Sequence, residues 1–281
     1  MNMPAAAPAP AEILARQRAA FLRDGAPGIA ERKADLKRLR RTLIAWRPRI
    51  EAAVSADFGH RSRHETAVME IVPTVQGIDY LIRNLRRFMR PRRRHVAVTM
   101  QPGRARIEYQ PLGVIGVVAP WNYPVSLAIM PIATAIAAGN RVMVKPSEYT
   151  PETSALLVQM LGTVFPPDQV AVILGDAAVG AAFSGLAFDH LLFTGSTAVG
   201  RAVTGARAPN ESGGNISENR LRSFSRFSSL TKPIFTSVLT ASRQSPASPV
   251  VPRCTTSDPR NCWWRLRSSI SPNSGFRPSC A

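Results

Sequence analysis

Apolar residues recur every three or four positions along the first 90 residues, which is the spacing of amphipathic helices. Ala11–Leu22 and Glu31–Val54 follow this pattern, and the second segment carries Arg and Lys on its other face. A third segment, Glu65–Met89, is followed by Pro91, and proline disfavours a helical conformation in the residue before it. The sequence therefore predicts three helices, of which the last ends before Pro91.

Two short segments after these helices alternate between apolar and polar residues, as half-buried strands do. They are His95–Met100 and Arg104–Gln110, and the turn sequence Gln-Pro-Gly lies between them. This arrangement predicts a β-hairpin.

Strand and helix patterns then alternate four times. The segment 113–120, GVIGVVAP, is wholly apolar, as expected of a strand buried on both faces. The further predicted strands are 141–146, 170–175 and 190–195, and the predicted helices are 126–138, 152–165, 176–185 and 196–206. This alternation predicts an α/β fold with a parallel, doubly wound sheet.

Residues 207–281 show no period. They are rich in Ser, Arg and Pro, and their apolar stretches are short and isolated. Such a composition buries little apolar area, so we expect an irregular or disordered tail.

The chain of 281 residues is 45% hydrophobic and carries a formal net charge of +18. This charge is compatible with anionic partners such as nucleic acid, acidic membrane or phosphate ligands. No aromatic residues are interleaved with the basic helix faces to stack on bases. We therefore expect solvated helix faces and no specific nucleic-acid site, and a basic nucleic-acid-associated protein remains an alternative that rests on charge alone.

All three cysteines, Cys254, Cys262 and Cys280, lie in the tail. Their placement fits a reducing compartment, and the first residues do not have the pattern of a secretory signal. We therefore expect a cytoplasmic protein.

The apolar run Val114–Gly139 is long enough to raise the question of a membrane span. Pro120, Asn122, Pro124 and Pro131 interrupt it. We expect a buried strand, a turn and a helix there, with no span.

Gly195 is placed at the end of a predicted strand, and Gly200 lies inside the next helix. Glycine in such a turn lets backbone N–H groups approach a pyrophosphate at the helix N-terminus. A tight turn between strand and helix also needs glycine for steric reasons alone, so both interpretations stay open.

Lys145 and Glu148 lie just beyond another strand, at the edge where open α/β sheets bind ligands. Lys145 can donate to sugar hydroxyls or phosphate, and Glu148 can accept from a ribose hydroxyl. The alternative is a helix start, in which Ser147 or Thr150 caps the helix and Glu148 complements its dipole.

Trp121 and Asn122 follow the first strand of the sheet. The Asn122 amide can donate to a developing oxyanion, or Asn122 can be a turn residue between two prolines. No set of metal ligands is apparent: His60 and His64 share helical spacing, but no Cys or third His accompanies them.

Three stretches occur in a fixed order: PLGVIGVVAPWNYP, then AAGNRVMVKPSE, then FDHLLFTGSTAVGR. Together they resemble the aldehyde dehydrogenase superfamily. The stretches HRSRHET, NLRRFMRPRRRHV and IEYQPLGVIGVVAPWNYPV look more like its coniferyl aldehyde dehydrogenase branch, close to the fatty and aromatic aldehyde type. The resemblance runs from about Ala11 to Ala206 and covers no part of the tail.

That family oxidises aldehydes to acids with NAD or NADP through a cysteine thiolate and a thioester. The resemblance implies that Asn122 holds the oxyanion and that Lys145 and Glu148 bind the adenosine ribose. The carboxylate of Glu148 would repel a 2′-phosphate, so NAD is expected and NADP less so. The other positions expected at the cofactor are Trp121 in its cleft, Gly195, Ser196 and Gly200 near the pyrophosphate, and Val199 beside the adenine or the cofactor backbone.

The sequence departs from the family after the helix of the third stretch. The E-L-G-G-K segment with the general base and the G-Q-x-C segment with the nucleophile are both absent. The three tail cysteines lack the expected neighbours. The change near Val203–Ala208 resembles a translated frameshift, and a genuine divergent tail is the other possibility.

The resemblance implies the following organisation: a helical segment 1–94, a hairpin segment 95–110, an incomplete Rossmann-like NAD-binding domain 111–206 and an aberrant tail 207–281. By this resemblance we expect an aldehyde dehydrogenase that acts on a small-molecule aldehyde. We expect the present chain to be inactive, and its full-length relatives to form homo-oligomers. A non-catalytic nucleotide-binding or interaction fragment is the alternative.

Overall fold

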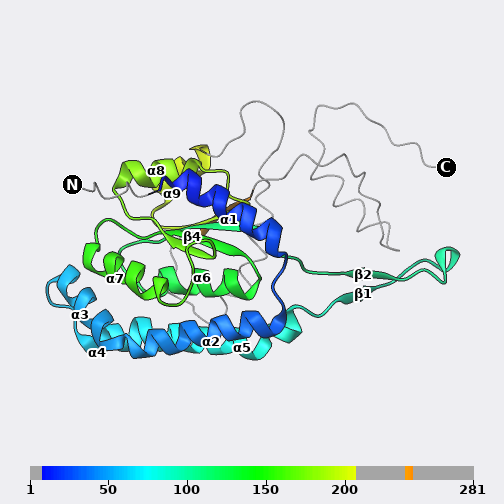
Figure 1. Cartoon of the computed structure of the whole chain (residues 1–281), viewed down its shortest axis with the longest axis horizontal. Coiled ribbons are helices and arrows are strands. Elements are labelled where there is room, and N and C mark those ends of the chain that lie inside the picture. The colour runs from blue at the N-terminus through cyan, green and yellow to red at the C-terminus, as the bar shows by residue number, and fades with distance from the viewer. Residues whose placement is uncertain (1–7, 207–237, 243–281) are drawn as a thin grey trace. The chain divides into compact units, whose positions relative to one another are not determined.

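A computed structural model describes residues 8–206 and 238–242. Within the described residues, Arg90–Tyr109 forms one compact unit and the remainder forms another. The larger unit contains a sheet with helices on both sides (Figure 1).

The N-terminal region is helical, as predicted. Its elements are α1 Pro10–Asp24, α2 Ile29–Ala45, α3 Arg47–Phe58, α4 Arg63–Thr66, the π-helical turn Ala67–Ile71 and α5 Val72–Phe88. The helices expected at 11–22 and 65–89 are present, and α5 ends three residues before Pro91.

The single helix predicted over Glu31–Val54 is wrong, because the chain forms two helices that meet at Trp46. Pro48 stands in the first turn of α3. Proline lacks a backbone N–H and its ring clashes with the carbonyl four residues earlier, so a straight helix cannot pass through it.

The third predicted helix contains a wider turn that the periodicity did not predict. In the π-helical turn, the Val72 N–H bonds the Ala67 carbonyl, five residues earlier. Pro73 follows directly and has no N–H for the carbonyl one turn before it. Val68, an apolar residue within this turn, is 64% exposed.

The predicted hairpin is present, but its first strand lies earlier than expected. β1 Arg92–Arg94 pairs antiparallel with β2 Ala105–Ile107. The predicted strand residues Val98–Met100 form a 3-10 turn, η2. Val98 and Met100 are exposed, so no packed face favours an extended conformation there, and local turn hydrogen bonds form instead.

The doubly wound parallel sheet is confirmed. Its parallel strands are β3 Val114–Val118, β4 Arg141–Lys145, β5 Val170–Val172 and β6 His190–Thr194, in the order β5-β4-β3-β6. The helices that follow these strands are α6 Ser126–Ala137, α7 Pro151–Gly162, α8 Ala177–Gly185 and α9 Thr197–Ala206.

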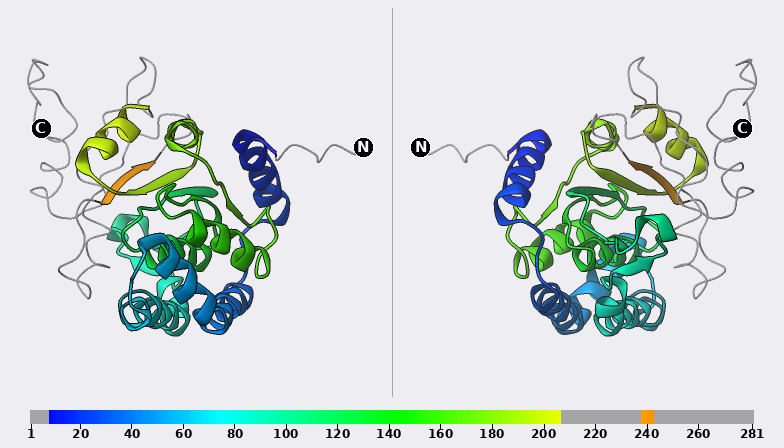
Figure 2. Two further views of the ribbon diagram at one scale, coloured as in Figure 1. Left: turned by 90° about the vertical axis from the view of Figure 1, so that its left-hand side faces the viewer. Right: turned by 90° about the vertical axis from the view of Figure 1, so that its right-hand side faces the viewer.

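Alternate strand residues divide between two apolar cores. Ile115, Val117 and Val144 face a core shared with α2, α3, α5, α6 and α7. Val114 and Met143 face a second core, with residues of α1 and α8. Because successive side chains of a strand point to opposite faces, the central strands supply both cores. Helices cover both faces of the sheet (Figure 2).

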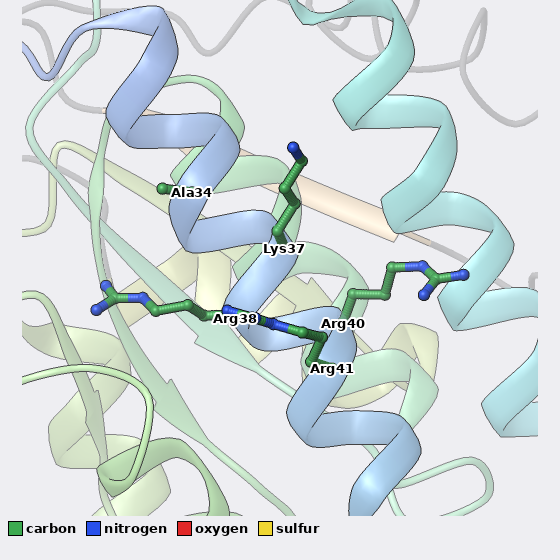
Figure 3. A pocket seen from close by; sticks show the side chains of 5 residues that line it. All are labelled: Ala34, Lys37, Arg38, Arg40 and Arg41. Atoms are coloured by element: carbon green, nitrogen blue, oxygen red, sulfur yellow. The ribbon is translucent and has the colours of Figure 1, made fainter.

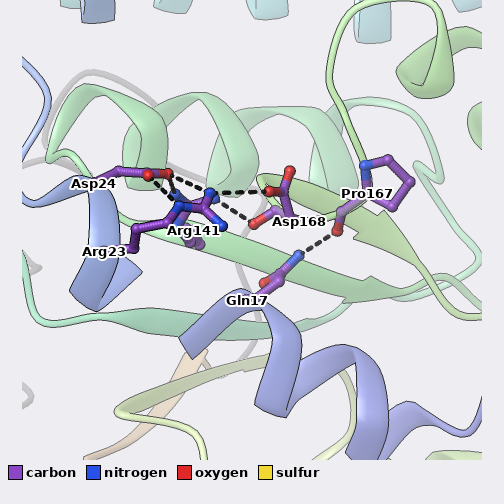
Figure 4. A network of polar contacts seen from close by, with 6 residues as sticks. All are labelled: Gln17, Arg23, Asp24, Arg141, Pro167 and Asp168. Atoms are coloured by element: carbon purple, nitrogen blue, oxygen red, sulfur yellow. Dashed lines mark hydrogen bonds and ion pairs between the residues drawn. The ribbon is translucent and has the colours of Figure 1, made fainter. Parts of the chain in front are cut away.

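Helix α1 is held against the sheet by polar contacts as well (Figure 4). The buried Gln17 side chain donates to the carbonyls of Val142 at 3.1 Å and Pro167 at 3.0 Å. At the end of α1, Asp24 pairs with Arg141 at the start of β4. These contacts connect the N-terminal helix with the strands that carry the site.

The tail expected at 207–281 to be irregular differs in its one described segment. β7 Val238–Ser242 pairs antiparallel with β6. Its Val-Leu-Thr sequence favours extended structure, and β6 offers an unpaired edge beyond β3. The rest of that prediction, with the three cysteines, lies outside the described residues.

The apolar run Val114–Gly139 forms β3, a loop and α6, as expected. Among the described helices, none is long and apolar enough to cross a membrane.

Candidate functional site

The strand order places the candidate residues at one edge of the sheet. The chain runs outward from β3 to β4 and β5, then returns to β6 on the other side of β3. Such a reversal opens a crevice at the carboxyl ends of the two central strands, where α/β proteins bind ligands. Asn122 follows β3 and Gly195 follows β6, so both lie at this switch point.

Lys145 and Glu148 form an ion pair next to the switch point. Lys145 is the last residue of β4, its side chain is 4% exposed, and its Nζ contacts Glu148 Oε2. A Cβ placed on Gly180 of α8 would lie 3.6 Å from Lys145 Cε, so α8 packs close to this side chain. The pair is therefore held in place from two elements.

The carboxylate of Glu148 stays ionised in this setting. Burial by itself raises its pKa, but hydrogen bonds from Lys145 and from its own backbone N–H, with the charge of Lys145, outweigh burial. The net pKa is lowered, although Asp176 acts in the opposite direction. An ionised carboxylate accepts hydrogen bonds from sugar hydroxyls.

The alternative interpretation, in which Ser147 or Thr150 caps the following helix, is wrong. The Ser147 Oγ accepts from the Tyr149 N–H at 3.3 Å, which lies before α7. Thr150 occupies the N-cap position of α7, but its side chain makes no capping hydrogen bond. The Asp57 carboxylate of α3 accepts instead from the backbone N–H groups of Glu152 at 3.0 Å and Thr153 at 2.8 Å.

Around Gly195 the structure supports the steric interpretation. A Cβ on Gly195 would approach the Phe193 ring to 2.5 Å. Ser196 caps α9, because its Oγ accepts from the Val199 N–H at 3.4 Å. Gly200 is buried, whereas Ser196 and Val199 are exposed, so the first turn of α9 is open to an anion from solvent.

The loop after β3 carries Trp121 and Asn122, and both are exposed. The Trp121 ring packs against Phe58 with centroids 6.2 Å apart. The Asn122 backbone carbonyl accepts from Arg61 Nη1 at 2.9 Å.

Two functional candidates were missed from the sequence, Arg61 and Glu70. Glu70 is fully buried, and its Oε2 accepts from the Val125 and Ser126 N–H groups at the start of α6. The sequence signal that could have indicated Glu70 was the presence of one acidic residue within the otherwise apolar run AVMEIV.

The predicted site residues share one edge of the sheet but do not all touch. Val118 of β3 pairs with Lys145 on one side and with Phe193 on the other. Among the described residues, Lys145 contacts Glu148, and the Ser196 side chain contacts the Val199 backbone. The groups after β3, β4 and β6 therefore form three separate parts of a crevice.

A separate hollow lies on α2, where its lining is almost wholly basic (Figure 3). The lining residues are Ala34, Lys37, Arg38, Arg40 and Arg41. Arg38 pairs with Asp35 at 2.6 Å and Arg40 with Asp79 at 2.7 Å. These pairings fit the solvated helix face expected from the sequence.

The comparisons with known proteins agree with this fold. The family model "Aldehyde dehydrogenase family" matches residues 6–215. The fold is a doubly wound α/β sheet, a class in which ligands commonly bind at the switch point. The chain belongs to the aldehyde dehydrogenase family.

Similar curated proteins include a "Probable coniferyl aldehyde dehydrogenase" of Pseudomonas aeruginosa, 50% identical over 198 residues. A "Coniferyl aldehyde dehydrogenase" of Pseudomonas sp. is 45% identical over 198 residues. These alignments cover 70% of this chain and 42% and 40% of the relatives. The chain thus spans less than half the length of either relative.

Two solved structures support the fold. An aldehyde dehydrogenase of Staphylococcus aureus in a substrate-bound state has a TM-score of 0.67 and 28% identity, covering 69% of this chain and 42% of that one. An NAD-dependent benzaldehyde dehydrogenase of Corynebacterium glutamicum has a TM-score of 0.61 and 27% identity, covering 70% and 44%.

Proposed function

We propose that this chain is the cofactor-binding part of an NAD-dependent aldehyde dehydrogenase of the coniferyl aldehyde type. The observation that carries this proposal is the Lys145–Glu148 pair at the carboxyl end of β4, beside the switch point. Family membership supports NAD or NADP as the cofactor, and the identity of the curated relatives supports an aromatic aldehyde.

The residues present fit a dinucleotide. Glu148 is an ionised acceptor for ribose hydroxyls, and Lys145 is a donor beside it. The first turn of α9, with Gly195 and Ser196 before it, presents N–H groups suited to a pyrophosphate. Val199, Gly200 and Trp121 complete the proposed contacts, and a bound nicotinamide would supply the hydride acceptor of the reaction.

Asn122 is proposed as the donor to the oxygen of the aldehyde as negative charge develops there. The thiolate nucleophile and the general base have no counterparts in this sequence. We therefore propose that the chain itself does not oxidise aldehydes. The change near Val203–Ala208 then marks a shift of reading frame that replaced the segments carrying both groups.

A non-catalytic nucleotide-binding fragment is the second candidate. This candidate is supported by the absence, from the printed sequence, of the family's segments that carry the nucleophile and the general base. For the whole protein we propose a cytoplasmic homo-oligomer acting on a small-molecule aldehyde, with no specific nucleic-acid partner.

The test restores the reading frame after Thr204 and measures NADH formation with an aromatic aldehyde. We expect activity in the restored protein and none in the present chain, with or without Ser in place of the three tail cysteines. A restored protein that carries both missing segments but acts on no aldehyde would contradict the assignment. Cysteine-dependent turnover by the present chain would contradict the proposed inactivity.

A further inference from the structure

The loop that carries Asn122 is contacted by two buried side chains, Arg61 and Glu70, that lie far from it in the sequence. Glu70 is fully buried, and the Arg61 side chain is 6% exposed. Burying two charged groups is costly unless their contacts compensate. The contacts they make are therefore informative about what the pair does.

Glu70 satisfies the start of α6. Its Oε2 accepts from the backbone N–H of Val125 at 2.8 Å and of Ser126 at 3.1 Å. These N–H groups have no partner within the helix, and Val125, at the N-cap, has no capping side chain. Glu70 belongs to the π-helical turn, a distortion often found at functional sites.

Arg61 connects Glu70 with Asn122 itself. Its Nη1 donates to the Asn122 carbonyl at 2.9 Å and lies 3.5 Å from Glu70 Oε1. The guanidinium lies 4.8 Å from the ring centres of Phe58 and Tyr123, and Tyr123 is the next residue of the loop. The pair therefore holds both the backbone of Asn122 and the end of the loop at α6.

We propose that Arg61 and Glu70 are positioning residues that hold the Asn122 loop in one conformation. This arrangement exceeds what a helix cap requires, because a local Ser or Asp would cap α6 without a buried ion pair. The catalytic consequence rests on the proposed function of Asn122. The structural consequence, an ordered loop, does not depend on that function.

The first test is amide hydrogen exchange on the full chain, with strands β3 and β4 as the internal reference. Glu70→Leu removes the acceptor, Glu70→Gln keeps one, and Arg61→Met removes the donor to Asn122. Glu65→Gln is the matched control, since Glu65 also pairs with Arg61, at 3.2 Å, but from a half-exposed position.

We expect Glu70→Leu to raise exchange at Val125 and Ser126 about tenfold or more, because a hydrogen bond to a charged acceptor is lost. Arg61→Met should raise exchange at Leu127, because its N–H donates to the carbonyl of the loop residue Tyr123 at 3.0 Å. Glu70→Gln should keep most of the protection, and Glu65→Gln all of it.

Unchanged exchange at Val125 and Ser126 in Glu70→Leu would overturn the proposal. A rise in exchange in β3 and β4 equal to the rise at these two residues would also overturn it. If Glu70→Leu does not fold, Arg61→Met decides, and exchange at Leu127 that is unchanged from the wild type overturns the proposal.

The second test uses the frame-restored protein. Misplacement of a catalytic group can cost about a hundredfold in rate, so Arg61→Met should lower kcat by a large factor and leave KM for the aldehyde nearly unchanged. Unchanged kcat in Arg61→Met would overturn a positioning role. If the restored wild type is inactive, the proposed function fails, and the exchange experiment still decides the structural claim.

Discussion

At the scale of single residues, two carboxylates of the same region have opposite electrostatic environments. Glu148 lies beside a lysine that keeps it ionised, whereas the fully buried Glu70 has a raised pKa. For Glu70, burial outweighs the N–H donors of Ser126 and Val125 and the charge of Arg61, and the charge of Glu65 acts with burial. Opposite shifts give opposite dependences of stability on pH.

The Glu148 carboxylate is expected to stabilise the fold only where it is ionised. Its folded pKa lies below the ordinary value of 4.5, so its contribution is present above that pH and is lost as pH falls through the folded pKa. Lys145 and Asp176 are the charged groups that act on it. Urea unfolding of wild type and Glu148→Gln below pH 4.5 should show wild type losing its advantage. A constant difference between them would contradict this.

For Glu70 the sign is reversed. Its folded pKa lies above the ordinary value of 4.5, so the folded state holds the proton more tightly and stability falls as pH rises from 4.5 through the folded pKa. The free energy of unfolding of wild type, relative to Glu70→Gln, should decrease across that window. A wild type that gains stability relative to Glu70→Gln as pH rises would show that Arg61 dominates over burial.

Residue roles were only partly predictable from the sequence. Lys145 and Glu148 were found because they lie at the end of an apolar strand and just beyond it, and strand ends mark ligand sites in parallel sheets. Glu70 was not found, since a charge next to Ile71 in a helix is normally assigned to the solvent face. Its burial depends on the loop of β3, which lies more than fifty residues further along the chain.

At the scale of elements, two helix starts are satisfied by side chains from distant helical segments. Asp57 of α3 caps α7, and Glu70 caps α6. The sequence predicted these helices from periodicity, but it could not predict caps that come from distant segments. It also missed the break at Trp46 and the π-helical turn, because apolar spacing does not register how proline disrupts backbone hydrogen bonds.

Removing the distant cap of α7 should be costly. Asp57→Ala leaves the Glu152 and Thr153 N–H groups without their acceptor, and loss of a cap costs about 1 kcal/mol of unfolding free energy. Urea denaturation would measure this loss of unfolding free energy, provided that the m value is the same in the variant and the wild type. Asp57→Asn keeps an acceptor and should lose less, and equal losses in the two variants would show that charge, not capping, matters.

At the scale of the whole molecule, the N-terminal helices and the sheet form one compact unit in the described residues. The parallel, doubly wound sheet was predicted from the alternation of apolar strands and helices, whereas its strand order and its switch point come from the structure. β7 was not predicted, because its pairing with β6 depends on a partner edge and not on a local period. The division into domains and the inactivity of this chain remain proposals.

The account as a whole depends on whether the carboxyl edge of this sheet binds NAD. Calorimetric titration of the full chain with NAD and NADP, repeated with Lys145→Met and Glu148→Gln, tests this directly. We expect weak NAD binding that Lys145→Met abolishes, NADP weaker by about tenfold because its 2′-phosphate meets Glu148, and a smaller difference between the cofactors in Glu148→Gln. Absence of NAD binding, or tighter binding of NADP by the wild type, would contradict the account.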